Sequence, residues 1–372
     1  AAEDRGQFSA ILKDLGVSQP EGGAVRSAEE ALELAENLGY PLMVRPSFVI
    51  GGLAMALVES EEDLKNVLSL AFEAMPGQSV LVDRFVVGTE YELDAVCDGG
   101  DILVPGIFEH LDPAGIHSGD SMAVFPDLSL SPSKREEMMR VVASIAEALD
   151  VKGLLNVQFV ESAGKLYVIE ANPRASRTVP ISGKLTGLPL VDLSVKVAMG
   201  QRLRNLGVPL GLVPSRGPLG VKVPVFSTEK LPGVDSRPGP QMQSTGESLG
   251  VGECVSTALW EGLRGAGWVL PDRGRILVTV NDASKPGACS AAATLFGLGW
   301  EVEATAGTSG FFRRWGLPAA SVEKGGSLVA AIREKRWDLI VNVAGSRLGE
   351  LKDGYAIRRA AIETGIPCVS SL

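Results

Sequence analysis

Two neighbouring polar segments of the chain carry residue types that can hold a metal ion. They are Asn156-Val157-Gln158-Phe159 and Ile169-Glu170-Ala171-Asn172-Pro173-Arg174, and the short loop Ala163-Gly164-Lys165 lies between them. If this loop turns two strands into a hairpin, residues equidistant from it face each other, so Gln158 lies opposite Glu170. Side chains alternate along a strand, which places Asn172 on the same face. We therefore predict that Gln158, Glu170 and Asn172 converge.

Positively charged and flexible residues accompany this predicted cluster. Arg174 and Arg177 follow its second strand, Arg45 ends an earlier strand, and the turn Gly51-Gly52 comes six residues later. Amide and carboxylate oxygens suit Mg²⁺, which leaves its other positions to water and phosphate oxygens. Glycine N–H groups can approach phosphate oxygens closely. This combination is what phosphoryl transfer requires. The alternatives are a solvated edge strand and an ordinary hairpin turn.

The composition describes a globular protein of two or three domains. The chain has 372 residues, 45% hydrophobic and 22% charged, and contains no apolar run of the ~20 residues that a membrane span needs. It opens without a secretory signal, and its four cysteines show no CxxC spacing. We therefore expect a cytoplasmic protein without a zinc site or a disulfide framework. The net charge of −10 argues against nucleic-acid binding.

Residues 1–200 predict a mixed α+β domain with mostly antiparallel strands. Apolar residues recur at helical spacing within 8–40, and further helices are expected at 61–74 and 133–149. Strands are expected at 42–45, 53–58, 79–85, 91–97, 102–108, 153–161 and 165–171. Residues 201–270 are rich in proline, and we interpret them as a connector with short strands.

Residues 271–372 predict a second domain of a different class. Strands at 275–280, 301–304, 319–322, 338–343 and 366–370 alternate with helices at 286–297, 308–314, 327–335 and 354–364. This alternation predicts an α/β fold with a doubly wound parallel sheet and helices on both faces. The chain ends without a final covering helix and begins without a leading α/β subdomain, so we expect both ends to be truncated.

Several stretches of the sequence match the motifs of a known family. They are YPLMVRPS (40–47), EHLDPAGIHSGDS (109–121), GLLNVQF (153–159), IEANPRASRTVP (169–180) and STGE (244–247). On these stretches the chain resembles the ATP-grasp enzymes, and more narrowly the carboxyl-terminal half of the carbamoyl phosphate synthetase large subunit. The run EHxxxAGxHSGDS is the most specific of the motifs. The second domain resembles the effector-binding domain that closes this subunit and shares the fold of methylglyoxal synthase.

The resemblance implies an ATP-dependent ligase. In that family this half phosphorylates carbamate, which the other half makes from bicarbonate and ammonia, to give carbamoyl phosphate for arginine and pyrimidine biosynthesis. The implied cofactors are ATP, Mg²⁺ or Mn²⁺, and K⁺. The implied partners are carbamate, a phosphorylated effector such as UMP, and a glutamine amidotransferase small subunit reached through the missing amino-terminal half. Neither a nucleic acid nor a membrane is implied, and the isolated fragment can be inactive.

The resemblance also assigns residues to the nucleotide and its metal. The metal residues would be Gln158, Glu170 and Asn172. The arginines that neutralise phosphate and carbamate oxygens would be Arg45, Arg174 and Arg177, because the planar guanidinium can bond two oxygens at once. The other implied nucleotide contacts are Gly51, Gly52, Asp83, Arg84, Val86, Glu90, Ile116, His117 and Ser118. Glu90 would accept a hydrogen bond from the ribose. A monovalent cation would bind among Glu90, His110 and Ser118.

A second candidate site lies in the predicted parallel domain. Its residues follow the carboxyl ends of the strands, and they are Lys285, Thr305, Thr308, Lys324 and Asn342. Doubly wound sheets bind ligands at this edge, and hydroxyl and ammonium groups suit a phosphate, although any one of these residues alone would be an ordinary loop residue. The resemblance assigns the set to a nucleotide effector such as UMP. It also likens Asp112, Asp120 and Glu247 to ornithine-binding carboxylates.

Three residues depart from the family pattern. Leu53 stands where many bacterial relatives have arginine, Arg84 replaces a commoner histidine, and Ala344 replaces a hydroxyl residue. Methylglyoxal synthase activity is not expected, because the catalytic acidic and histidine residues of that enzyme have no counterpart. Two alternatives stay open: another ATP-grasp ligase, such as a biotin carboxylase or a purine-pathway ligase, and a non-catalytic nucleotide sensor that lacks part of the cleft.

Overall fold

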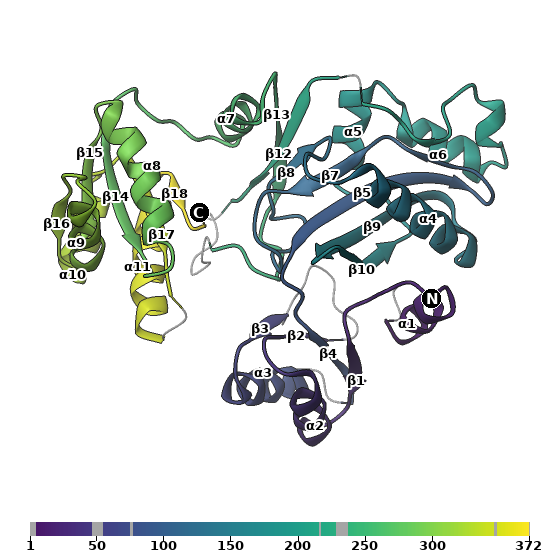
Figure 1. The fold of residues 1–372 in the computed structure, drawn as a ribbon, viewed down its shortest axis with the longest axis horizontal. Coiled ribbons are helices and arrows are strands. Elements are labelled where there is room, and N and C mark those ends of the chain that lie inside the picture. Colours follow the sequence, from purple (N-terminus) through teal and green to yellow (C-terminus); the bar gives the residue numbers. More distant parts are fainter. Residues whose placement is uncertain are drawn as a thin grey trace. The chain divides into compact units, whose positions relative to one another are not determined.

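The computed structural model describes residues 5–46, 55–74, 77–215, 217–227, 237–345 and 348–371. Gly51, Gly52 and Leu53 therefore lie outside the described residues. The chain forms two compact units (Figure 1): the first comprises residues 1–225 and 239–266, and the second comprises residues 226–238 and 267–372. Among the helices of the described ranges, none combines the length and the apolar character that crossing a bilayer requires.

A four-stranded antiparallel sheet lies near the start of the first unit. It contains β1 (Gly22–Val25), β2 (Leu42–Pro46), β3 (Ala56–Val58) and β4 (Val80–Arg84), in the order β1-β4-β2-β3. The helices of this region are α1 (Arg5–Asp14), α2 (Ala28–Leu38) and α3 (Glu61–Ala74). Apolar residues of α2 and α3 pack against the sheet. Gly22 is needed in β1, because a Cβ there would lie 2.2 Å from Asp83 Oδ1 on β4.

A nine-stranded sheet forms the larger part of the first unit. Its strands are β5 (Thr89–Asp98), β6 (Ile102–Val104), β7 (Ile107–His110), β8 (Ala123–Phe125), β9 (Lys152–Ser162), β10 (Lys165–Asn172), β11 (Gly211–Leu212), β12 (Leu219–Val225) and β13 (Gly246–Gly252). The main path is β10-β9-β5-β7-β8-β12-β13, and β6 and β11 pair beside β5. The helices are α4 (Pro132–Ala148), α5 (Val179–Thr186), α6 (Leu190–Ala198) and α7 (Val255–Gly265), with a 3₁₀ turn at Leu203–Asn205.

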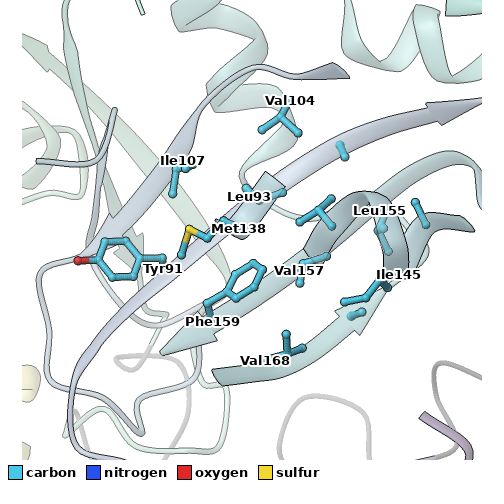
Figure 2. Close-up of a cluster of buried hydrophobic side chains, with 14 of the residues drawn as sticks. Tyr91, Leu93, Val104, Ile107, Met138, Ile145, Leu155, Val157, Phe159 and Val168 are labelled. Atoms are coloured by element: carbon cyan, nitrogen blue, oxygen red, sulfur yellow. The ribbon is translucent and has the colours of Figure 1, made fainter. Parts of the chain in front are cut away.

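Along its central strand β5, the large sheet has one apolar face and one polar face. Tyr91 and Leu93 point into a core that includes side chains of β9, β10 and α4 (Figure 2). Because side chains alternate along a strand, Glu90, Glu92 and Asp94 lie on the opposite face. This opposite face is where the candidate site of the first unit is built.

The hairpin of β9 and β10 has the predicted partner residues but a less simple register. Ala163 (φ 48°) and Gly164 (φ 79°) both have positive φ, as a two-residue type I′ turn requires. Pairing begins with Lys165 opposite Ser162 and runs to Val168 opposite Phe159. The register then shifts by one residue at a β-bulge, after which Glu170 faces Gln158 and Asn172 faces Asn156.

A five-stranded parallel sheet forms the second unit, which confirms the predicted fold class. Its strands are β14 (Arg275–Val280), β15 (Glu301–Thr305), β16 (Ala320–Val322), β17 (Leu339–Val343) and β18 (Cys368–Val369), in the order β16-β15-β14-β17-β18. The helices are α8 (Lys285–Gly297), α9 (Ala306–Arg314), α10 (Gly326–Arg333) and α11 (Leu348–Thr364). Two separate hydrophobic clusters cover the two faces of the sheet, one with α8 and α9 and the other with α10 and α11.

Three local expectations differ from the structure. The stretch 8–40, expected to be helical, contains the strand β1 between α1 and α2. The strand expected at 102–108 is divided into β6 and β7, because Pro105 and Gly106 interrupt it. The expected connector contributes β12 and β13 to the large sheet, where β12 pairs with β8. The domain boundaries at residues 200 and 270 stay predictions.

Candidate functional site

The predicted metal residues meet on the polar face of the β9–β10 hairpin. Gln158 lies directly opposite Glu170, and the Nδ2 group of Asn172 donates a 2.8 Å hydrogen bond to Oε1 of Glu170. The Nε2 group of Gln158 donates a 2.9 Å hydrogen bond to the hydroxyl of Ser118. Because both amides use their nitrogen as a donor here, their oxygens are the atoms that a cation can use.

This oxygen set fits a hard cation such as Mg²⁺. Two amide oxygens and one carboxylate are ligands that Mg²⁺ accepts, and it usually keeps further positions for water or phosphate. The described residues contain no group of three or more His, Cys, Asp or Glu side chains that could hold a metal ion. A metal at the hairpin would therefore depend on the amides of Gln158 and Asn172 as well as on Glu170.

Arg177 follows the hairpin and is fixed to the segment before β13. Its Nη1 donates to the hydroxyl of Ser244 at 2.6 Å, and its Nη2 donates to the carbonyl of Ser244 at 3.0 Å. Its Nε lies 3.7 Å from Oε2 of Glu247. Arg174 is exposed, and its guanidinium donates to the carbonyl of Ala175 at 3.2 Å. The two predicted arginines of this loop thus differ, because Arg177 is firmly held and Arg174 is not.

Arg45 is paired within the small sheet. Its guanidinium forms a salt bridge with Asp83 across β2 and β4, and both residues are buried. The buried Nε of Arg45 has no hydrogen-bond partner within the described part of the chain, so it can serve an anion. The neighbouring Arg84 points elsewhere: its guanidinium donates to the carbonyl of Leu38 at 2.7 Å and lies 3.7 Å from Glu21.

Three buried charged side chains and the partly buried Glu90 form a network. His110 Nδ1 lies 3.3 Å from Glu90 and His110 Nε2 lies 3.5 Å from Glu92, while the ammonium of Lys222 lies 3.5 Å from Glu92. Burial would lower the pKa of His110, but the two carboxylates outweigh burial and raise it to about 9. Burial would raise the pKa of Glu92, but Lys222 and His110 outweigh burial and lower it to about 2.

The network is electrically balanced. Two carboxylates face one imidazolium and one ammonium, and Glu90 also accepts a 3.0 Å hydrogen bond from the backbone N–H of Gly115. The assignment of Glu90, His110 and Ser118 to a monovalent cation stays a prediction, because the balanced charges supply no electrostatic need for one.

The loop between β7 and β8 contains His117 and Ser118. Lys222 donates a 2.6 Å hydrogen bond to the carbonyl of Ser118, and Nδ1 of His117 accepts one of 3.0 Å from the N–H of Gly119. Burial lowers the pKa of His117, and the charges that act on it include those of Glu170 and Arg177. Ile116 lies in the same loop, and Val86 lies in the loop between β4 and β5; both are partly buried.

The carboxylates likened to an ornithine site have structural partners. Asp120 accepts hydrogen bonds from the backbone N–H groups of Gln243 at 2.7 Å and Ser244 at 2.9 Å. Asp112 accepts a 2.7 Å hydrogen bond from the backbone N–H of Met122. These two carboxylates hold loops in place, and Glu247 lies next to Arg177.

The second unit contains a cleft of about 700 Å³ at the carboxyl ends of its strands. All five residues predicted for an effector line it, namely Lys285, Thr305, Thr308, Lys324 and Asn342. A Cβ at Gly307 would lie 3.6 Å from the ammonium of Lys285, which places this cation close to the start of α9. Lys285 also pairs with Asp282 at 2.5 Å. Ala344, the residue that departs from the family pattern, is part of the same lining.

Four further residues belong to these sites and were not predicted from the sequence. Glu92 and Asp94 follow Glu90 with a period of two, so the alternation in Glu90-Tyr91-Glu92-Leu93-Asp94 was the signal for an acidic row. Lys222 interrupts the apolar run Gly220-Val221-Lys222-Val223, which marks a buried charge. Arg358, only 1% exposed, donates a 2.7 Å hydrogen bond to Oδ1 of Asn342. The sequence of α11 around Arg358 has no pattern that would indicate a buried charge.

Family comparisons match both units. The carbamoyl-phosphate synthase L chain, ATP binding domain, matches residues 4–206, and the MGS-like domain matches residues 287–370. The carbamoyl phosphate synthase large chain of Clostridium perfringens (strain 13 / Type A) is 43% identical over 376 residues, which is 100% of this chain and 35% of that protein. The chain thus spans about a third of the length of the curated relatives it matches. It belongs to the carbamoyl-phosphate synthase large-chain family.

Solved structures share the fold of the first unit. A biotin carboxylase complex with β-γ-ATP from Campylobacter jejuni has a TM-score of 0.56 at 19% identity, over 71% of this chain and 66% of its own. The biotin carboxylase domain of the Hydrogenobacter thermophilus 2-oxoglutarate carboxylase, in complex with MgADP, ADP and bicarbonate, has a TM-score of 0.52 at 22% identity, over 62% and 52%. At these identities the likeness shows the ATP-grasp fold alone.

Proposed function

We propose that the first unit binds ATP with Mg²⁺ or Mn²⁺ and transfers a phosphoryl group to carbamate, which gives carbamoyl phosphate for arginine and pyrimidine biosynthesis. The observation that carries the proposal is the meeting of Gln158, Glu170 and Asn172 on one face of a hairpin, in a chain of this family. The three side chains offer oxygens only, as a nucleotide-bound hard cation requires.

The residues around the hairpin have distinct roles in this proposal. When bound, the metal would neutralise the charge of the nucleotide phosphates. Arg177, held by Ser244, would present its positive charge to phosphate and carbamate oxygens from a fixed place. The buried Nε of Arg45 would donate to a phosphate oxygen, since burial leaves an unpaired donor costly. His117 would face the nucleotide as a neutral imidazole, because burial lowers its pKa.

The cation and partner assignments follow from the same proposal. K⁺ would bind beside Glu90 and Ser118 only with His110 in its neutral form, since the imidazolium already balances the carboxylates. A glutamine amidotransferase small subunit would deliver ammonia through a part of the protein outside this chain. We place the reaction in the cytoplasm.

The second unit would bind a phosphorylated effector such as UMP. Its cleft combines two ammonium groups, two threonine hydroxyls and the first residues of α9, and each of these can bond a phosphate oxygen. Binding there would regulate phosphoryl transfer if the effector prefers one state of the whole protein over another.

The reverse reaction tests the proposal. Microscopic reversibility requires the first unit to make ATP from carbamoyl phosphate and ADP, without ammonia or bicarbonate. We would measure this reaction with the sequence placed at the matching position of a full-length large chain, with Gln158→Ala and Glu170→Ala as controls. We expect Mg²⁺-dependent ATP formation that both substitutions abolish.

Two other outcomes would favour the alternatives. A folded protein that binds MgADP but makes no ATP would be a nucleotide sensor. A protein that prefers carboxyphosphate chemistry to carbamoyl phosphate would resemble a biotin carboxylase in activity as well as in fold. Either outcome would overturn the proposed function.

A further inference from the structure

A buried carboxylate holds the loop that carries the site arginines. Asp94, 2% exposed on the central strand β5, accepts a 2.7 Å hydrogen bond from the hydroxyl of Ser176 through Oδ1 and a 2.6 Å bond from the hydroxyl of Thr178 through Oδ2. The amide of Asn156 on β9 donates a third bond of 3.1 Å to Oδ1. The loop after β10 is thus tied to the middle of the sheet at two points.

These two points lie on either side of Arg177. Ser176 and Thr178 also contact each other at 2.7 Å, and the N–H of Thr178 donates to the hydroxyl of Ser176 at 3.1 Å. The backbone of Arg177, which lies between them, therefore has little freedom to move. On its other side, the guanidinium of Arg177 is bound to Ser244.

In this arrangement the hydroxyl of Thr178 bonds to Asp94 and does not cap its own helix, α5. Thr178 is the N-cap of α5, a position where a threonine hydroxyl normally accepts a bond from a backbone N–H of the first turn. Here its side chain makes no capping bond, and its hydroxyl donates to Asp94 instead. The carboxylate is also in an unfavourable place, because burial raises the pKa of Asp94 to about 6 despite its three donors. The side chain of Thr178 therefore orders the loop at Asp94 and not the start of α5.

We infer that Asp94 is a positioning residue for Arg177: its carboxylate fixes Ser176 and Thr178, and so sets the place from which the guanidinium meets the transferred phosphoryl group. The inference rests on the proposed function of the first unit. A reacting group that is misplaced by about 1 Å can lose on the order of 10²-fold in rate. Asp94 touches neither nucleotide nor metal in this account.

A second carboxylate of the same strand supplies a matched control. Asp98 is also buried, at 4% exposed, but it accepts its bonds from the N–H groups of Gly100, Asp101 and Leu203 and from the guanidinium of Arg202, away from the loop of Arg177. Burial would raise its pKa, but these backbone bonds outweigh burial and lower it. Loss of its charge should therefore reduce stability, whereas loss of the charge of Asp94 should not.

The test compares Asp94→Asn with Asp98→Asn in the full-length large chain, at pH 7.5. Asp94→Asn should lower kcat for ATP formation from carbamoyl phosphate and ADP by about 10²-fold with an unchanged or higher Tm. Asp98→Asn should lower Tm and leave kcat within about twofold. Thr178→Val should reproduce the loss of kcat, and Thr178→Ser, which keeps the hydroxyl, should recover most of it.

The kcat and Tm values of these variants decide whether Asp94 positions Arg177. If Asp94→Asn retains normal kcat, or loses kcat only together with Tm as Asp98→Asn does, the positioning role is wrong. If the wild-type protein makes no ATP, the proposed function fails, and binding of carbamoyl phosphate then decides the inference instead. In that case Asp94→Asn should weaken binding at least tenfold while Asp98→Asn should not, and equal affinities would overturn the positioning role.

Discussion

The two candidate sites hold their charged groups in different ways. In the candidate site of the first unit, charges are buried and paired with one another: the side chains of Lys222 and Glu92 are 1% and 4% exposed. In the cleft of the second unit, Lys324 is exposed. The side chain of Lys285 is 15% exposed and pairs with Asp282, whose side chain is 95% exposed. The first arrangement fixes positions before a ligand arrives, and the second leaves cations accessible at the ends of parallel strands.

This difference has consequences for substitutions. A buried pair that loses one partner leaves an uncompensated charge, so a change to Lys222 or Glu92 should affect both chemistry and stability. An exposed cation has water as an alternative partner, so a change to Lys324 should affect ligand binding and little else. The predictions below test this contrast.

Glu170→Gln should have the largest effect. The substitution keeps the volume of the side chain but removes the one carboxylate from the predicted metal set, so phosphoryl transfer should fall by 10²-fold or more. Steady-state ATP formation at saturating Mg²⁺ measures this. Glu161→Gln on β9, near the turn of the same hairpin, is the control and should keep normal turnover. Near-normal turnover of Glu170→Gln would contradict the metal assignment.

Lys324→Ala and Lys285→Ala should abolish the response to the effector. A charge-assisted hydrogen bond contributes about 1.5–3 kcal/mol, so UMP should bind on the order of 10- to 100-fold more weakly, with catalysis in the absence of UMP unchanged. Calorimetric titration with UMP measures the affinity. Arg314→Ala, an exposed cation of α9 outside the cleft, is the control. Unchanged titration curves in both lysine variants would exclude this site.

Arg358→Met should show that one part of the second unit's cleft depends on a buried charge, as the candidate site of the first unit does. The guanidinium can only donate, so it fixes Oδ1 of Asn342 as acceptor and leaves the NH₂ group of Asn342 for the ligand. Its loss should cost about 1–3 kcal/mol of stability, because a buried acceptor loses its donor. UMP should also bind about tenfold more weakly.

Thermal denaturation and UMP titration measure the two effects of Arg358→Met. Arg333→Met removes an exposed arginine of the same unit that pairs with Glu363, and it should change neither quantity. A loss of stability with normal UMP affinity would show that Arg358 has no influence on the ligand.

A pH dependence of stability due to Asp94 is also expected. Burial raises its pKa from 3.8 to about 6 in the folded protein, so the folded state binds more protons than the unfolded state between these values. The contribution of Asp94 to the free energy of unfolding should therefore fall as pH rises from 4 through 6, by at most about 3 kcal/mol. Asp94→Asn should lack this fall. Equal pH profiles for the two proteins would place the pKa of Asp94 near its ordinary value.

The parts of the structure that follow local rules could be predicted from the sequence. The alternating strands and helices of 275–370 predicted the parallel sheet, and the strand ends predicted five of the residues that line its cleft. The hairpin partners Gln158 and Glu170 were also predicted correctly. The turn alone would not place them opposite each other, because the register shifts at a bulge. No residue type in the strand indicates that bulge.

The parts that depend on tertiary contacts could not be predicted. β1 begins with two glycines and lacks a strand pattern, and it is a strand because Gly22 fits closely against Asp83. β12 and β13 lie in a proline-rich segment, yet they extend the large sheet. Asp94 looked like one acidic residue among many, and its role depends on a loop more than 80 positions later.

The central claim is that the first unit catalyses phosphoryl transfer and the second unit only modulates it. The most direct test is a UMP titration of ATP formation from carbamoyl phosphate and ADP, with UMP binding measured on the same samples of wild type, Glu170→Gln and Lys324→Ala. We predict that Glu170→Gln binds UMP normally but makes no ATP, and that Lys324→Ala makes ATP at the unregulated rate and ignores UMP. Loss of ATP formation in Lys324→Ala without UMP, or loss of UMP binding in Glu170→Gln, would contradict this separation of roles.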